Sequence, residues 1–144
     1  METIFIADTP EPMPYGRILI VDDVETNLYV AMGLLMPYKL KVETVNSGLG
    51  AIKKITDGNT YDIVFMDHMM PVMDGIEATQ KIRELGYTGT IVALTANALV
   101  GNDEMFRENG FDSFIPKPID VILLNKVLKK FVRDKHLNLF RQRL

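Results

Sequence analysis

The chain has 144 residues, which is enough for one domain with little spare length. Apolar residues make up 47% and charged residues 24%, the usual proportions of a folded globular domain. The net charge of -3 argues against direct binding to nucleic acid. The absence of cysteine excludes disulfides, zinc–thiolate sites and cysteine nucleophiles. No apolar run approaches the ~20 residues of a membrane span, and the proline-broken start lacks a secretory signal. We therefore expect a cytoplasmic protein, or the cytoplasmic part of a membrane-bound sensor, that makes no membrane contact of its own.

The pattern along the chain indicates three parts. Residues 1–16 are interpreted as a linker or leader, because Pro10, Pro12 and Pro14 remove backbone donors that regular structure needs. Residues 17–133 are expected to form the folded domain. Residues 134–144 leave two interpretations open: they extend the last helix, or they form a basic tail.

Short runs rich in β-branched residues indicate five strands, at residues 17–21, 40–45, 62–66, 90–94 and 113–115. The first, third and fourth runs show no polar alternation, which is typical of strands buried on both faces of a parallel sheet. Amphipathic segments with capping and stop residues predict helices at residues 25–36, 48–56, 75–85, 97–109 and 121–133. This regular alternation predicts an α/β fold with a doubly wound, five-stranded parallel sheet and five helices.

Polar residues follow the strands at their carboxyl ends, the edge where such sheets bind ligands. Asp22 and Asp23 follow the first strand, Asp67 the third, Thr95 the fourth and Lys117 the fifth. Three carboxylates at one edge repel one another unless a cation joins them. An all-oxygen site without histidine or cysteine ligands suits a hard divalent ion, so we expect Mg²⁺ as the cofactor.

This set of side chains also suits phosphoryl transfer. A carboxylate beside Mg²⁺ can attack phosphorus and form an acyl phosphate. That chemistry needs a cation and a hydroxyl on the phosphoryl oxygens, and Lys117 and Thr95 are the available groups.

The chain resembles the receiver (CheY-like) domain of two-component signalling in four segments: RILIVDDVETN, DIVFMDHMMPVMDG, IVALTAN and FIPKP. The resemblance covers residues 17–133 and implies a flavodoxin-like sheet with strand order 2-1-3-4-5. The segments MDHMMPVMDGIEAT and ENGFDSFIPKPID are most similar to receivers of hybrid sensor histidine kinases. The chain is thus expected to be either a stand-alone regulator or a receiver from such a kinase.

The resemblance implies a role for each matching residue. Asp67 would be the phosphoacceptor and a metal ligand, Asp23 a direct Mg²⁺ ligand, Asp22 a ligand mainly through water, and Met69 a ligand through its backbone carbonyl. Thr95 would hydrogen-bond the phosphoryl group, and Lys117 would pair with it.

Other residues near the site have implied roles of a different kind. Phe114 occupies the family's aromatic switch position, and the Lys117–Pro118 bond is expected to be cis. Met69 and Asn97 occupy the two positions that tune the lifetime of the phosphoryl group. Because a thioether holds water poorly, we hypothesise that the lifetime depends more on Asn97. His68 is expected to be an exposed loop residue without a chemical role.

The resemblance further implies a signalling switch with slow autodephosphorylation. The donor would be a histidine kinase or a histidine phosphotransfer domain. Phosphorylation would change the surface of the fourth helix, fifth strand and fifth helix (residues 97–109, 113–115 and 121–133), which would bind a partner or a second copy of the chain.

Three other functions remain as alternatives. An aspartate-nucleophile phosphatase needs a second acid two residues after its nucleophile, and Met69 stands there. A dinucleotide-binding domain needs a glycine-rich turn after the first strand, where this chain has DDVETN. A pseudo-receiver that acts only as a binding module is disfavoured by the complete set of site residues.

Overall fold

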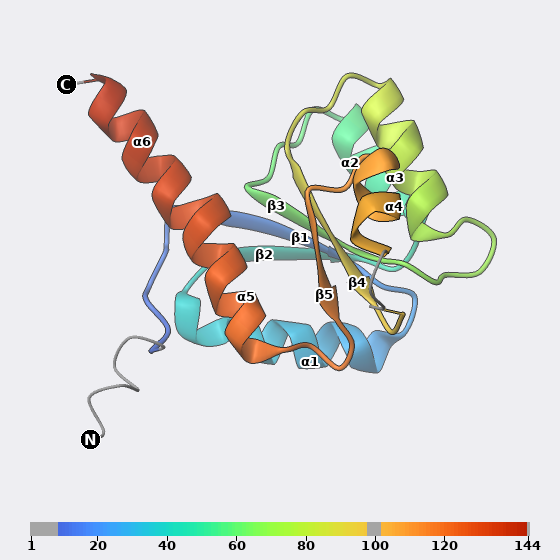
Figure 1. Cartoon of the computed structure of the whole chain (residues 1–144), viewed down its shortest axis with the longest axis horizontal. Coiled ribbons are helices and arrows are strands. Elements are labelled where there is room, and N and C mark those ends of the chain that lie inside the picture. Colours follow the sequence, from blue (N-terminus) through green and yellow to red (C-terminus); the bar gives the residue numbers. More distant parts are fainter. Residues whose placement is uncertain (1–8, 98–101, 144) are drawn as a thin grey trace.

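The computed structural model describes residues 9–97 and 102–143. Its centre is a five-stranded parallel sheet with the order β2-β1-β3-β4-β5 (Figure 1). The strands are β1 (Arg17–Val21), β2 (Lys41–Val45), β3 (Ile63–Asp67), β4 (Thr90–Thr95) and β5 (Ser113–Pro116). The helices are α1 (Glu25–Leu35), α2 (Gly48–Thr56), α3 (Gly75–Glu84), α4 (Asn102–Glu108), α5 (Val121–Leu128) and α6 (Asp134–Arg143). The predicted doubly wound fold and its strand order are confirmed.

The helices cover both faces of the sheet, α1 and α5 on one face and α2, α3 and α4 on the other (Figure 1). Strand β1 shows the consequence for its own side chains. Ile18 and Ile20 pack in the core beneath α1 and α5, whereas Leu19 and Val21 pack in the core beneath the other helices. Burial on both faces explains why this strand has no polar alternation.

Capping residues fix where three of the helices begin. The side chain of Ser47 accepts a hydrogen bond from the backbone of Gly50, and that of Asp74 accepts one from Glu77. Asp120 accepts from the first turn of α5. These bonds satisfy backbone donors that a helix start leaves free. They also set the loops that lead from the sheet edge into each helix.

The structure differs from the sequence-based expectation at the start of the fourth helix. Asn97 was expected to begin that helix, but it lies outside any helix, and the described part of α4 is Asn102–Glu108. The backbone N–H of Asn97 donates instead to the side chain of Thr95 at 3.0 Å. Residues 98–101 of the expected helix lie outside the described residues.

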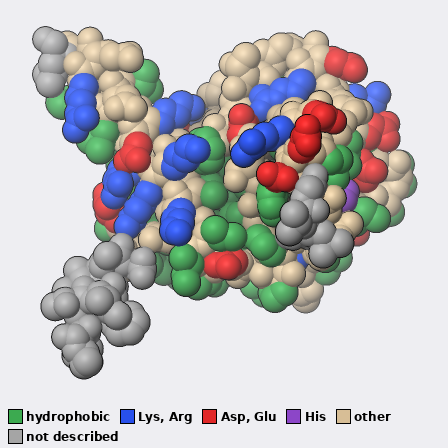
Figure 2. All heavy atoms as spheres, in the orientation of Figure 1, with side chains coloured by type: hydrophobic (Ala, Val, Ile, Leu, Met, Phe, Trp, Pro, Cys, Tyr) green, Lys and Arg blue, Asp and Glu red, His purple; other side chains and the backbone are tan. Residues whose placement is uncertain are grey.

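The last helix continues beyond Arg133, which is one of the two interpretations left open by the sequence. A π-helical turn, Lys129–Arg133, joins α5 directly to α6, which continues to Arg143. No glycine or proline interrupts residues 121–143, so nothing in the sequence stops the helix. The open question about the C-terminal residues is therefore answered by a helix for residues 134–143. The continuous helix of α5 and α6 forms a rod that extends away from the sheet, with basic side chains gathered along it (Figures 1 and 2).

Part of the expected linker belongs to the folded body. Met13 is fully buried in the core between α1 and α5, and its N–H bonds to the carbonyl of Tyr38. Tyr15 packs against the ring of His136 in α6, whose Nε2 lies 2.7 Å from Oδ1 of Asp62. The prolines break regular structure here without preventing tertiary packing. Among the described residues, no helix is both long and apolar enough to cross a bilayer.

Candidate functional site

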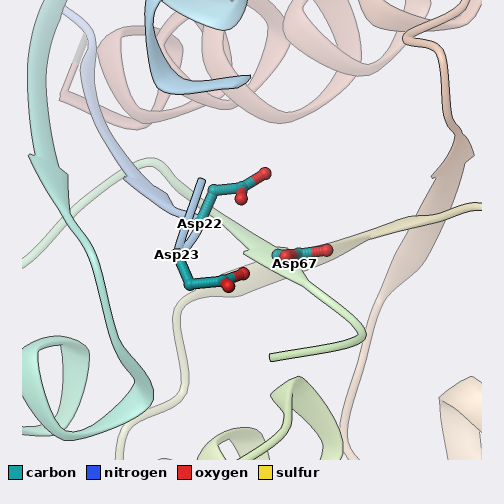
Figure 3. Close-up of side chains that lie close together, drawn as sticks. All are labelled: Asp22, Asp23 and Asp67. Atoms are coloured by element: carbon teal, nitrogen blue, oxygen red, sulfur yellow. The ribbon is translucent and has the colours of Figure 1, made fainter. Parts of the chain in front are cut away.

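Three carboxylates meet at the carboxyl edge of the sheet, as the strand ends predict (Figure 3). Asp22 and Asp23 follow β1, and Asp67 is the last residue of β3. One oxygen from each lies within 4.8 Å of the other two. Asp22 and Asp67 are buried, while Asp23 is exposed at the mouth of the site. The cluster is thus buried at Asp22 and Asp67 and reaches solvent at Asp23.

Lys117 provides the positive charge that compensates two of these acids. Its Nζ donates to Oδ1 of Asp67 at 2.8 Å and to Oδ2 of Asp22 at 2.9 Å. Burial opposes the charge on the ammonium, but the hydrogen bonds to both carboxylates outweigh it and raise the pKa of Lys117. Lys117 therefore stays protonated. The peptide bond from Lys117 to Pro118 is cis, as expected.

The negative charge of Asp67 is less well stabilised than the positive charge of Lys117. Its burial raises the pKa of its carboxyl group to about 6, against the opposing effect of the Lys117 ammonium. The neighbouring charges of Asp22 and Asp23 push this pKa in the same direction as burial. One lysine is thus insufficient for three acids, and a further cation at this edge would relieve the repulsion.

The donor set fits Mg²⁺ better than a transition metal. The three carboxylates supply hard oxygen ligands, and no histidine or cysteine among the described residues joins the cluster. Met69, whose backbone carbonyl is the fourth expected ligand, lies in the loop after β3 with its side chain 69% exposed.

Gly75 keeps the loop after β3 close to the site. A Cβ at this position would collide with the backbone carbonyl of Asp67, so only glycine fits. Its N–H donates to the carbonyl of His68 at 2.8 Å and closes the loop onto the start of α3.

Thr95 ends β4 in a buried position and is held by its neighbours. The side chains of Thr95 and His68 lie 3.1 Å apart, Oγ1 to Nδ1. Phe114 on β5, the expected switch residue, is half-buried and stacks on Phe106 of α4 with ring centres 5.7 Å apart.

The expectation that His68 is an exposed loop residue was wrong. Its side chain is buried, contacts Thr95, and packs edge-on against Phe106 at 5.2 Å. A position directly after a strand predicts a loop, but burial here comes from α4, far along the chain. The one sequence signal was its place between Asp67 and the apolar Met69 and Met70.

The fold and this edge define a doubly wound α/β domain with an acidic, lysine-paired cleft. The chain belongs to the response regulator receiver domain family, whose model matches residues 18–129. It is therefore a receiver domain of two-component phosphorelay signalling.

Relatives of two kinds support this conclusion. Two-component response regulator 24 of Arabidopsis thaliana is 35% identical over 112 residues, which cover 78% of this chain and 81% of the relative. Sensor histidine kinase RcsC of Salmonella typhimurium is 38% identical over 122 residues, which cover 85% of this chain but 12% of that kinase. The same domain thus occurs in small regulators and inside long kinases.

Solved structures agree with the fold. The receiver domain of sensor histidine kinase PA1611 from Pseudomonas aeruginosa, solved with magnesium in its active-site cleft, has a TM-score of 0.71 and 34% identity. The match covers 81% of this chain and 97% of that one. The receiver domain of Ssk1 from Saccharomyces cerevisiae, solved with the histidine phosphotransfer protein Ypd1, has a TM-score of 0.75 and 24% identity. That match covers 88% of this chain and 92% of the other.

Proposed function

We propose that Asp67 accepts the phosphoryl group, in a site where Asp22, Asp23, Asp67 and the backbone carbonyl of Met69 hold Mg²⁺. The observation that carries this proposal is the position of Asp67, which is buried, has a carboxylate oxygen within 4.8 Å of one from each of the other two acids, and lies 2.8 Å from Lys117. An anion in that place can be reached by a phosphoryl group from the open side of the cleft.

The side chains divide the work of the transfer. A carboxylate oxygen of Asp67 attacks phosphorus as the bond from phosphorus to the donor's imidazole nitrogen breaks, and the imidazole leaves as a neutral ring that keeps the proton already on its other nitrogen. The Lys117 ammonium moves from the carboxylate to a phosphoryl oxygen. The Thr95 hydroxyl donates a hydrogen bond to another phosphoryl oxygen. Bound Mg²⁺ supplies the further positive charge that the negatively charged phosphoryl oxygens require.

The exposed face of α1 is our proposed docking surface for a histidine kinase or histidine phosphotransfer domain. Tyr29 and Val30 are 66% and 59% exposed although both are apolar. Val30 also lines a cavity of about 430 Å³ together with Asp22 and Lys117, so this apolar surface is continuous with the site. A donor seated there would bring its histidine to Asp67. Ypd1, bound to the Ssk1 receiver in that structure, belongs to the expected class of partner.

Phosphorylation is proposed to change the surface formed by α4, β5 and α5. Phe106 and Phe114 link α4 to β5 behind this surface. An inward movement of Thr95 would leave space that Phe114 can fill, and the surface would then bind a partner or a second copy of the chain. Direct binding to nucleic acid is not part of this function.

The wider context is also a proposal. We infer that residues 17–133 act as the receiver unit, in the cytoplasm, and that the chain serves either alone or within a hybrid histidine kinase. The match to a small part of RcsC supports the second arrangement.

Incubation with acetyl phosphate and Mg²⁺, followed by intact mass, tests the proposal. We expect the mass of one phosphoryl group to be added, and none to be added without Mg²⁺. A protein that gains no mass with acetyl phosphate or phosphoramidate would be a pseudo-receiver. Steady release of phosphate from simple phosphoesters would instead indicate a phosphatase.

A further inference from the structure

His68 follows Asp67 directly, yet its side chain is directed into the protein. The residue is 9% exposed. Its backbone is fixed on both sides, since its N–H donates to the carbonyl of Leu94 at 2.9 Å and its carbonyl accepts from Gly75 at 2.8 Å. The ring therefore has a defined position between the end of β3 and the side chain of Thr95.

The hydrogen bonds around Thr95 permit its hydroxyl proton to be donated to His68. The backbone N–H of Asn97 already donates to Oγ1 at 3.0 Å. A threonine hydroxyl has one proton to donate, and Nδ1 of His68 lies 3.1 Å away. A neutral ring with its proton on Nε2 accepts that proton at Nδ1. In this arrangement the Thr95 hydroxyl points at His68 and is withheld from a phosphoryl group on Asp67.

The same ring contacts the aromatic cluster behind the α4–β5 surface. It meets Phe106 edge-on, with centres 5.2 Å apart and an interplanar angle of 82°. Phe106 in turn stacks on Phe114. The His68 side chain thus contacts both the hydroxyl that must move and Phe106, which in turn packs on Phe114.

From this geometry we propose that His68 is a positioning residue, which holds the Thr95 hydroxyl in the resting arrangement and releases it when Asp67 is phosphorylated. The hydrogen bond favours the resting state, because phosphorylation must break it before Thr95 can donate to the phosphoryl group. The proposal rests on the proposed function, since it requires the phosphoryl group to sit on Asp67.

Two substitutions separate the hydrogen bond from the ring. His68→Phe keeps the edge contact with Phe106 but removes the acceptor, whereas His68→Asn keeps a polar acceptor near the position of Nδ1 and removes the ring. Calorimetric titration measures the binding of beryllofluoride, a stable phosphoryl mimic, in the presence of Mg²⁺. We expect His68→Phe to bind ~3- to 10-fold more tightly than the parent, the change that loss of one resting hydrogen bond produces. His68→Asn should stay closer to the parent. Equal or weaker binding by His68→Phe, or equal tightening in both variants, would overturn the proposal.

A second measurement needs no substitution of His68. The ¹⁵N chemical shifts of its ring, recorded on the Mg²⁺-free protein at mildly basic pH, should show an unprotonated Nδ1 that accepts a hydrogen bond. Thr95→Val should change the Nδ1 shift far more than the Nε2 shift. A proton on Nδ1 would overturn the proposal. If the parent fails to bind beryllofluoride while the ring shifts are as expected, the proposed function is at fault and the His68–Thr95 bond stands.

Discussion

The ammonium of Lys117 lies 2.8 Å from Asp67 and 2.9 Å from Asp22, so one cation is shared by two buried carboxylates. Asp23 adds a third negative charge within reach of both acids. The resting site therefore carries an excess of negative charge.

The pKa of Asp67, raised from 3.8 to about 6, makes stability depend on pH. The folded chain holds this proton more tightly than the unfolded chain, so the free energy of unfolding falls as pH rises between these values and is constant above them. Asp67→Asn mimics the protonated form. We expect it to be more stable than the parent near neutral pH, by at most about 3 kcal/mol, and equally stable below pH ~4.

Urea denaturation in the presence of a chelator measures this difference. The matched control is Asp57→Asn, which removes a carboxylate from an exposed ion pair with Lys53. Equal stabilities of the parent and Asp67→Asn at neutral pH would show that the buried charge costs nothing.

Asp23 should matter more for metal binding than for folding. Its carboxylate is exposed and lies at the open side of the cluster, where it is free to face an incoming cation. We expect Asp23→Asn to weaken Mg²⁺ binding at least about 10-fold, since even outer contacts of metal sites are worth that much. Calorimetric titration with Mg²⁺ measures it, again with Asp57→Asn as the control. The expectation fails if the two variants bind Mg²⁺ alike.

The lifetime of the phosphoryl group should depend on Asn97 more than on Met69. The exposed amide of Asn97 can hold an attacking water, whereas a thioether is a weak acceptor. We expect Asn97→Ala to slow hydrolysis about 5-fold, the value of one lost hydrogen bond. Met69→Ala keeps the backbone carbonyl and should leave the rate unchanged. The decay of phosphorylated protein is followed by intact mass, and a parental rate in Asn97→Ala would refute the hypothesis.

Docking on α1 predicts a difference between large and small donors. Val30→Ser removes an exposed apolar contact beside the cleft without touching the acids. Transfer from a phosphorylated histidine phosphotransfer domain should slow about 5-fold, a typical cost for one interface side chain, while phosphorylation by acetyl phosphate should not change. The matched control is Leu49→Ser on α2, where the side chain is 60% exposed. Equal rates for both variants with the protein donor would place docking elsewhere.

Local patterns predicted the fold and the acidic edge well. Strand β1 is a short, mostly apolar run followed by two aspartates, and β3 and β4 end in Asp67 and Thr95. In a parallel sheet such ends must meet, so sequence order and strand ends are enough to bring these side chains together. The resemblance of four segments to receiver domains added the prediction of the strand order.

Tertiary contacts explain what local patterns missed. His68 is buried by Phe106, which comes from a helix that no pattern around His68 reveals. Met13 packs in the core although prolines surround it. The continuation of α5 into α6 is tied to the body by His136 and Asp62, a pair that only the folded chain brings together.

The central claim is that Asp67 itself carries the phosphoryl group, and chemical mapping tests it most directly. Borohydride reduces an aspartyl phosphate to homoserine, so the protein is phosphorylated with acetyl phosphate and Mg²⁺, reduced, digested and sequenced by mass spectrometry. We expect homoserine at position 67, with Asp22 and Asp23 unchanged. Homoserine at either of those positions, or an unmodified Asp67 in protein that has gained a phosphoryl group, would contradict the claim.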